Sequence, residues 1–245
     1  MEETSWWSKL ALVSSILAVV LLFASPLGYK HGVAPLMPSF ASLLLALAIA
    51  VLVLVGGVIM AVIAQRGGMQ PDRNVLLIAI VISLVPLLAM GPTMIKARSV
   101  PAIHDISTDT QNPPTFDVVV GLRADAPNSL EYGAGLESAA ALASMQLQAY
   151  PQIKTRAASL APSEAVARVA AVLAAQGMEV VNENVDDGRV EAVFTSFWFG
   201  FKDDIVVRVK PTEMGSAIDI RSVSRVGISD IGANAARIER ILTAL

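Results

Sequence analysis

The sequence predicts a membrane-anchored α+β protein, in which three transmembrane helices precede an antiparallel sheet with flanking helices. Two observations support this fold class. Residues 10–29, 31–65 and 74–95 contain no Asp, Glu, Lys or Arg. From residue 97 onward the charge returns, with 13 Lys and Arg against 18 Asp and Glu, and apolar residues alternate with polar ones at strand spacing. We therefore expect a transmembrane region over residues 1–96 and a soluble domain over residues 97–245.

The composition narrows the class of protein. Of the 245 residues 54% are hydrophobic and 16% charged, below the ~25% charged residues of ordinary globular chains. This excludes a simple cytosolic enzyme. The acidic soluble half argues against nucleic acid as a partner, because binding phosphates needs a basic surface. The chain has no cysteine, which excludes disulfides, thiol catalysis and cysteine zinc sites.

The transmembrane region contains three apolar segments of membrane length, at about residues 10–27, 41–64 and 75–95. A hydrocarbon core about 30 Å thick needs roughly 20 residues of helix, in which every backbone amide is paired. Pro86 should kink the third helix, and Gly91-Pro92 should end it early.

The first segment is interpreted as a retained anchor rather than a cleaved signal peptide. Its flank holds Glu2 and Glu3, which are atypical of a signal sequence, and Trp6 and Trp7, which suit a membrane interface. The orientation follows from the short loops. Over all flanks the positive charges are tied, with Lys9, Arg66 and Arg73 on one side and Lys30, Lys96 and Arg98 on the other. The short second loop has two arginines against one lysine in the first, which favours a cytoplasmic N-terminus and an extracytoplasmic soluble domain.

The soluble half begins with a proline-rich stretch, residues 99–135, that should be mostly irregular, with a possible short strand at 117–122. A helix is expected at 136–149, and another from Pro162 to a stop at Gly177. Strands are expected at 178–182, 190–195, 205–209 and 218–220, with a hairpin turn at 186–188. Ser229 should cap a last helix, whose apolar stripe is Ile231, Ala235, Ile238, Leu242 and Leu245.

Three stretches of the soluble half carry a resemblance. They are Ile103-His104-Asp105-Ile106-Ser107-Thr108-Asp109 with Pro113-Pro114-x-Phe116, then Phe199-Gly200-Phe201-x-Asp203-Asp204, then Asp219-x-Arg221-Ser222-x-Ser224-Arg225-x-Gly227 leading to Asp230-x-Gly232-Ala233-Asn234. Together they resemble the bacterial domain-of-unknown-function family 1499, over about residues 97–245. The resemblance implies an envelope-associated protein, and implies no reaction, cofactor or catalytic residue. Together with the three spans and their orientation, it leads us to expect a protein of the bacterial inner membrane with a periplasmic C-terminal domain.

His104 is the only histidine of the soluble half and carries the enzymatic alternative. A hydrolase would use it as a general acid or base tuned by Asp105 or Asp109. The other interpretation is a histidine that satisfies backbone groups where the linker meets the domain. Neither Ser222 nor Ser224 lies in the glycine pattern of a serine nucleophile.

Arg208, Arg221 and Arg225 form the candidate binding group. Their guanidinium groups could hold the carboxylate or phosphate of a lipid headgroup or an acidic partner. Alternatively they pair internally with aspartates and join the strands to the last helix. No metal site and no cofactor are expected, since Asp203, Asp204 and Asp230 lack the spacing of a calcium loop.

An aromatic cluster completes the candidates: Phe194, Phe197, Trp198, Phe199 and Phe201. It is either core or a contact for lipid or another subunit. The favoured function is therefore a non-enzymatic membrane-anchored envelope protein that binds membrane lipids or a membrane-protein partner.

Overall fold

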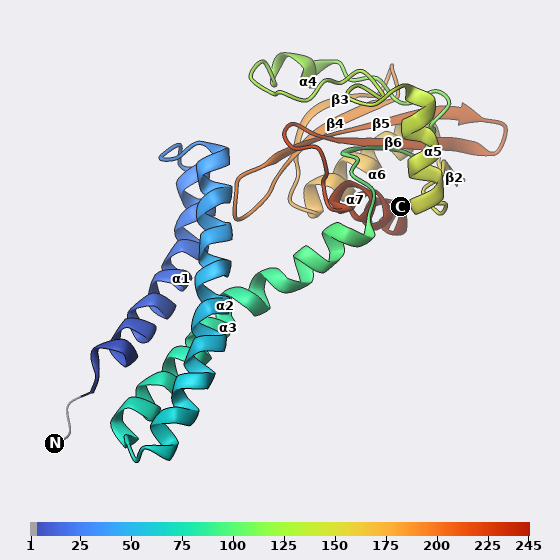
Figure 1. Cartoon of the computed structure of the whole chain (residues 1–245). Helices are drawn as coiled ribbons and strands as arrows, with labels where there is room; N and C mark the ends of the chain where they lie inside the picture. Colours follow the sequence, from blue (N-terminus) through green and yellow to red (C-terminus); the bar gives the residue numbers. More distant parts are fainter. Residues whose placement is uncertain (1–3) are drawn as a thin grey trace. The chain divides into compact units, whose positions relative to one another are not determined.

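A computed structural model of the chain describes residues 4–245, so Glu2 and Glu3 lie outside the described part (Figure 1). The chain separates into two compact units. The first is the chain up to Lys96 together with Trp198–Gly200, and the second is Ala97–Phe197 together with Phe201–Leu245.

The first unit is built on three helices, α1 (Trp6–Lys30), α2 (Leu36–Arg66) and α3 (Gln70–Ser99). All three are long and apolar enough to cross a membrane. The expected early end of the third helix at Gly91-Pro92 is wrong, since α3 runs through both Pro86 and Pro92 to Ser99. A proline removes one hydrogen bond from an apolar helix, which the neighbouring turns tolerate.

A buried carboxylate joins the start of α1 to the start of α3. Asp72 is 3% exposed and accepts hydrogen bonds from Ser5 N at 2.7 Å, Ser5 Oγ at 3.0 Å and Ser8 Oγ at 2.6 Å. These donors satisfy the charge in an otherwise apolar unit, because a buried carboxylate without partners is costly. The contact therefore fixes which ends of the two helices meet.

The second unit is an antiparallel six-stranded sheet. Its strands follow the order β1-β6-β5-β4-β3, and β2 pairs with β6 beside β1. The bounds are β1 Asp105–Ser107, β2 Arg156–Ala158, β3 Glu179–Asn184, β4 Arg189–Thr195, β5 Lys202–Thr212 and β6 Gly215–Ser224. The four strands expected from the alternation are β3 to β6, and the three-residue strands β1 and β2 are additional.

Two layers cover the sheet. Helices α6 (Pro162–Ala175) and α7 (Ala233–Ala244) pack on one face, and the segment that carries α4 (Val118–Gly121) lies on the other (Figure 1). A further helix, α5 (Ala139–Ala149), begins at Ser138, whose hydroxyl accepts from Ala141 N at 3.1 Å. The helix-covered face holds the apolar core, to which α6, α7, β4, β5 and β6 contribute.

Two local expectations are wrong. The possible strand at 117–122 is instead the short helix α4, because the carboxylate of Glu191 accepts from the amides of Asp117 at 2.6 Å and Val118 at 2.8 Å and stabilises a helical turn. The last helix begins at Ala233 rather than after Ser229. Asp230 does the capping, since its carboxylate accepts from Gly232 N and Asn234 N.

We predict that Asp72→Asn lowers the unfolding temperature of the chain in mild detergent. An amide cannot accept all three hydrogen bonds as charge-assisted ones, and each such bond contributes about 1.5–3 kcal/mol. Asp125→Asn, at an exposed carboxylate, is the control. Equal melting curves for the two variants would show that the Asp72 contact contributes nothing measurable.

Candidate functional site

The sheet face opposite the core helices is charged rather than apolar. Side chains of a strand alternate between its two faces, so Asp204, Val206 and Arg208 of β5 share this face. The ionisable residues on this face include Arg189 and Glu191 of β4, Asp204 and Arg208 of β5, Asp219 and Arg221 of β6, and Arg225, which directly follows β6. Most of them are buried beneath residues 108–137, so each charge needs a partner.

Arg221 is the most buried of the three candidate arginines, at 3% exposed. Its Nε and Nη2 donate to the two carboxylate oxygens of Asp105 at 2.9 and 2.7 Å, a bidentate pair across β6 and β1. Its remaining donors reach the carbonyls of Pro114 at 3.2 Å and Leu130 at 2.7 Å. Burial raises the pKa of Asp105, and the hydrogen bonds from Arg221 act against that rise.

Aromatic rings close the Arg221 site. The guanidinium carbon lies 5.5 Å from the ring centre of Phe116 and 5.3 Å from that of Tyr132. A cation beside two ring faces gains electrostatic stabilisation where water is excluded. This arginine therefore holds the irregular segment onto the sheet through a carboxylate, two carbonyls and two rings.

Arg225 makes a second bidentate pair on the same face. Its Nη2 donates to Asp204 Oδ1 at 2.7 Å and its Nε donates to Asp204 Oδ2 at 3.1 Å, and its Nη1 donates to the carbonyl of Leu122 at 2.8 Å. Asp204 is fully buried and also has Arg123 Nε at 3.0 Å, at an angle outside hydrogen-bond geometry. Burial lowers the pKa of Arg123. Two arginines therefore share one buried carboxylate.

Arg208 completes the layer. Its Nη2 lies 2.7 Å from Asp219 and 3.0 Å from Asp109. Asp219 also accepts from Thr155 Oγ1 at 2.5 Å. Asp109 in turn accepts from backbone amides two and three residues later. The structure thus pairs all three candidate arginines with aspartates of the same domain, and anion binding by them stays a prediction.

A second polar cluster lies on the opposite face, inside the core. Arg237 of α7 is 2% exposed and donates to Asp203 at 2.5 Å, Asn234 at 2.5 Å and Ser222 at 3.0 Å. Its guanidinium lies 4.4 Å from the ring centre of Phe194. Arg237 directly precedes Ile238 of the apolar stripe of the last helix, and the sequence analysis did not identify it as a candidate. The only sequence feature that could have identified it is a charged residue between two apolar positions of the stripe, Ala235 and Ile238.

The three aspartates considered as candidate cation ligands, Asp203, Asp204 and Asp230, have other partners in the structure. Asp203 and Asp204 point to opposite faces of β5, toward Arg237 and Arg225. Asp230 caps α7, and burial raises its pKa. Among residues 4–245 no group of three His, Asp or Glu residues could hold a metal ion.

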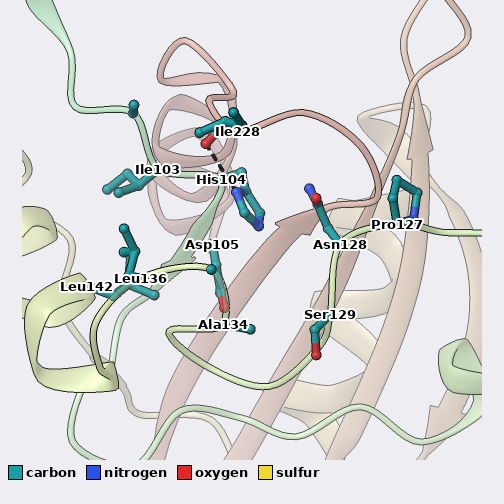
Figure 2. A pocket seen from close by; sticks show the side chains of 12 residues that line it. Ile103, His104, Asp105, Pro127, Asn128, Ser129, Ala134, Leu136, Leu142 and Ile228 are labelled. Atoms are coloured by element: carbon teal, nitrogen blue, oxygen red, sulfur yellow. Dashed lines mark hydrogen bonds between the residues drawn. The ribbon is translucent and has the colours of Figure 1, made fainter.

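His104 lies at a cavity of about 260 Å³ (Figure 2). Its imidazole Nδ1 is 3.2 Å from the carbonyl oxygen of Ile228. A carbonyl only accepts, so this bond places the proton of the neutral ring on Nδ1 and leaves Nε2 as an acceptor. The neighbouring Asp105 is held by Arg221, so His104 has no hydrogen bond to either aspartate of the enzymatic alternative.

The cavity combines one apolar side with polar groups. Ile103, Leu136, Leu142 and Ile228 supply the apolar surface. The polar residues of the lining are His104, Asp105, Asn128 and Ser129. Figure 2 shows the imidazole between Leu136 and Leu142 on one side and Asn128 on the other. The amide nitrogen of Asn128 donates to the carbonyls of Ser224 and Gly227, which holds this wall onto the end of β6.

Within the aromatic cluster, Phe194 packs against the core and under Arg237. Phe197 and Trp198 lie in the loop between β4 and β5 and are 74% and 49% exposed. The aromatic cluster therefore contains one residue packed against the core, Phe194, and exposed residues in the loop, Phe197 and Trp198.

These observations define a class: a small α+β domain with two buried ion-pair layers, joined to three apolar helices of membrane length. A family model, described as a protein of unknown function (DUF1499), matches residues 105–245. The match spans more than half of the chain, and the chain belongs to this family. A search of curated proteins found no match.

We predict that Arg221→Gln destabilises the soluble domain by about 3–5 kcal/mol, because it leaves Asp105 charged and unpaired in the interior. Chemical denaturation measures the loss. Arg240→Gln, at an exposed position of α7, is the control. The double variant Arg221→Gln, Asp105→Asn should recover part of the loss. Full additivity of the two single changes would contradict an ion-pair role.

Proposed function

We propose that this protein is a non-enzymatic membrane-anchored binding protein, and that the cavity beside His104 is its ligand site. The cavity itself carries the proposal. It is the place where a histidine acceptor, a serine hydroxyl and an apolar wall meet at one opening. The aspartates nearest to it are engaged in ion pairs, which favours binding over acid–base catalysis.

The lining of the cavity indicates the ligand. About 260 Å³ is just below the ~300–1,000 Å³ of sites for drug-sized ligands, so the bound part is small. Leu136, Leu142 and Ile228 suit a short hydrocarbon chain, and Nε2 of His104 suits a hydroxyl donor. We therefore infer a small neutral amphiphile, such as the glycerol end and first carbons of a monoacylglycerol. A membrane-protein partner is the other outcome of the test below.

The test compares two tryptophan variants of the full chain in lipid nanodiscs. Ala102 is an exposed residue of the cavity wall, and Ala124 is exposed and outside it. Ala102→Trp should abolish binding of a short-chain monoacylglycerol by calorimetry, whereas Ala124→Trp should bind like the parent. Empty nanodiscs correct for partitioning.

Equal binding by both variants would place the ligand elsewhere. Absence of binding by the parent, together with a membrane protein that copurifies with the parent and is lost from Ala102→Trp, would favour the protein partner.

We further propose that the helices lie in the bacterial inner membrane with the soluble domain on the periplasmic side. Two arginines, Arg66 and Arg73, flank the short connection between α2 and α3, against Lys30 at the connection of α1 and α2. The positive-inside rule favours the side with more arginine and lysine as cytoplasmic.

A fusion of alkaline phosphatase after Leu245 should be active, because this enzyme matures only outside the cytoplasm. A matched fusion in the connection at Gly67 should be inactive. The reverse pair of activities would invert the topology.

A further inference from the structure

The loop between β4 and β5 presents aromatic side chains in succession. Ser196 closes the loop, since its N donates to Phe201 O at 2.8 Å and its Oγ accepts from Phe201 N at 2.9 Å. Gly200 has a φ of +67°, a left-handed conformation that favours glycine. The turn therefore holds Phe197, Trp198 and Phe199 at its tip.

This tip is unusually apolar for an exposed loop. Phe197 is 74% exposed and Trp198 is 49% exposed. Exposure of two neighbouring aromatic rings to water is unfavourable, and such apolar patches mark contacts with lipid or with another protein. Exposure alone does not show whether the tip contacts lipid or another protein. The residues that the tip contacts distinguish the two.

Residues Trp198–Gly200 belong to the compact unit of the apolar helices. The ring of Trp198 lies 5.6 Å from that of Phe23, and the ring of Phe199 lies 6.3 Å from Tyr29 and 5.5 Å from Phe40. Tyr29 is in the last turn of α1, and Phe40 is in the second turn of α2. These are the ends of two spans, where the hydrocarbon gives way to headgroups.

The residues of the tip are of the types that favour the interface between hydrocarbon and headgroups. Aromatic rings, tryptophan above all, concentrate where hydrocarbon meets headgroups, because the ring is apolar and the indole N–H is polar. Lys30 ends α1, and Lys202 follows the loop at the start of β5. Lysine side chains extend toward anionic headgroups while their stems lie along apolar surface.

We propose that the loop Phe197–Gly200 is an interfacial anchor that inserts its aromatic rings into the carbonyl region of the bilayer that holds α1 and α2. This role goes beyond ligand binding in the cavity and is independent of it.

The test uses Trp198 as its own probe. The chain has three tryptophans, so Trp6→Phe with Trp7→Phe leaves Trp198 as the sole indole. The full chain is placed in nanodiscs of phosphatidylcholine and phosphatidylglycerol, with bromine near the carbonyl end or near the methyl end of the acyl chains. Carbonyl-end bromine should quench Trp198 at least about twofold more than methyl-end bromine, and aqueous iodide should quench it weakly.

A second hairpin supplies the matched control. Met214 is 87% exposed in the turn between β5 and β6, at the other end of the 11-residue strand β5. In a chain with Trp6, Trp7 and Trp198 replaced by Phe, Met214→Trp should be quenched by iodide and not by bromolipid. Iodide quenching of Trp198 without lipid quenching, shielding from both quenchers, or equal lipid quenching at both tips would each overturn the proposal.

Discussion

The buried pair between Arg221 and Asp105 is the contact on which the charged face of the sheet depends. Both side chains are almost completely buried, and such charges are stable only when every hydrogen-bonding position is used. The pair meets this condition by combining a bidentate bond with two backbone carbonyls from the covering segment. The segment that covers this face therefore needs backbone carbonyls at the positions where Arg221 can donate to them.

This explains why a long stretch with little regular structure covers one face of the sheet. The guanidinium groups of Arg221 and Arg225 accept no hydrogen bond and donate to the carbonyls of Pro114, Leu122 and Leu130. Glu191 supplies the complementary acceptor to amides at the start of α4. The segment thus takes its shape from the charges of the strands beneath it. The same attachment positions residues 127–129, which form one wall of the cavity beside His104.

The sequence predicts those parts of the fold that local periodicity controls. The three apolar helices follow from composition, α6 and the strands β3 to β6 follow from periodicity, and the family follows from the resemblance of three motifs. The strand at 117–122 and the cap at Ser229 failed, because a side chain distant in sequence (Glu191) and a different aspartate (Asp230) provide the hydrogen bonds. The pairing of Arg221 with Asp105 spans 116 residues, and no local pattern encodes it. His104 was identified as a candidate, but its cavity depends on residues from five separate stretches.

The motifs that carry the family resemblance also acquire a physical meaning. Asp105, Asp204, Arg221 and Arg225 belong to the charged face, whereas Asp203, Ser222 and Asn234 surround Arg237 on the core side. Motif residues are thus largely occupied in holding the domain together. Residues of this kind define an architecture without naming a ligand. In the ligand site proposed above, selectivity would come from side chains outside the buried ion-pair clusters, namely Ser129, Leu136 and Ile228. A change at one of these three residues leaves the buried ion pairs of Arg208, Arg221 and Arg225 intact, because none of the three belongs to those pairs.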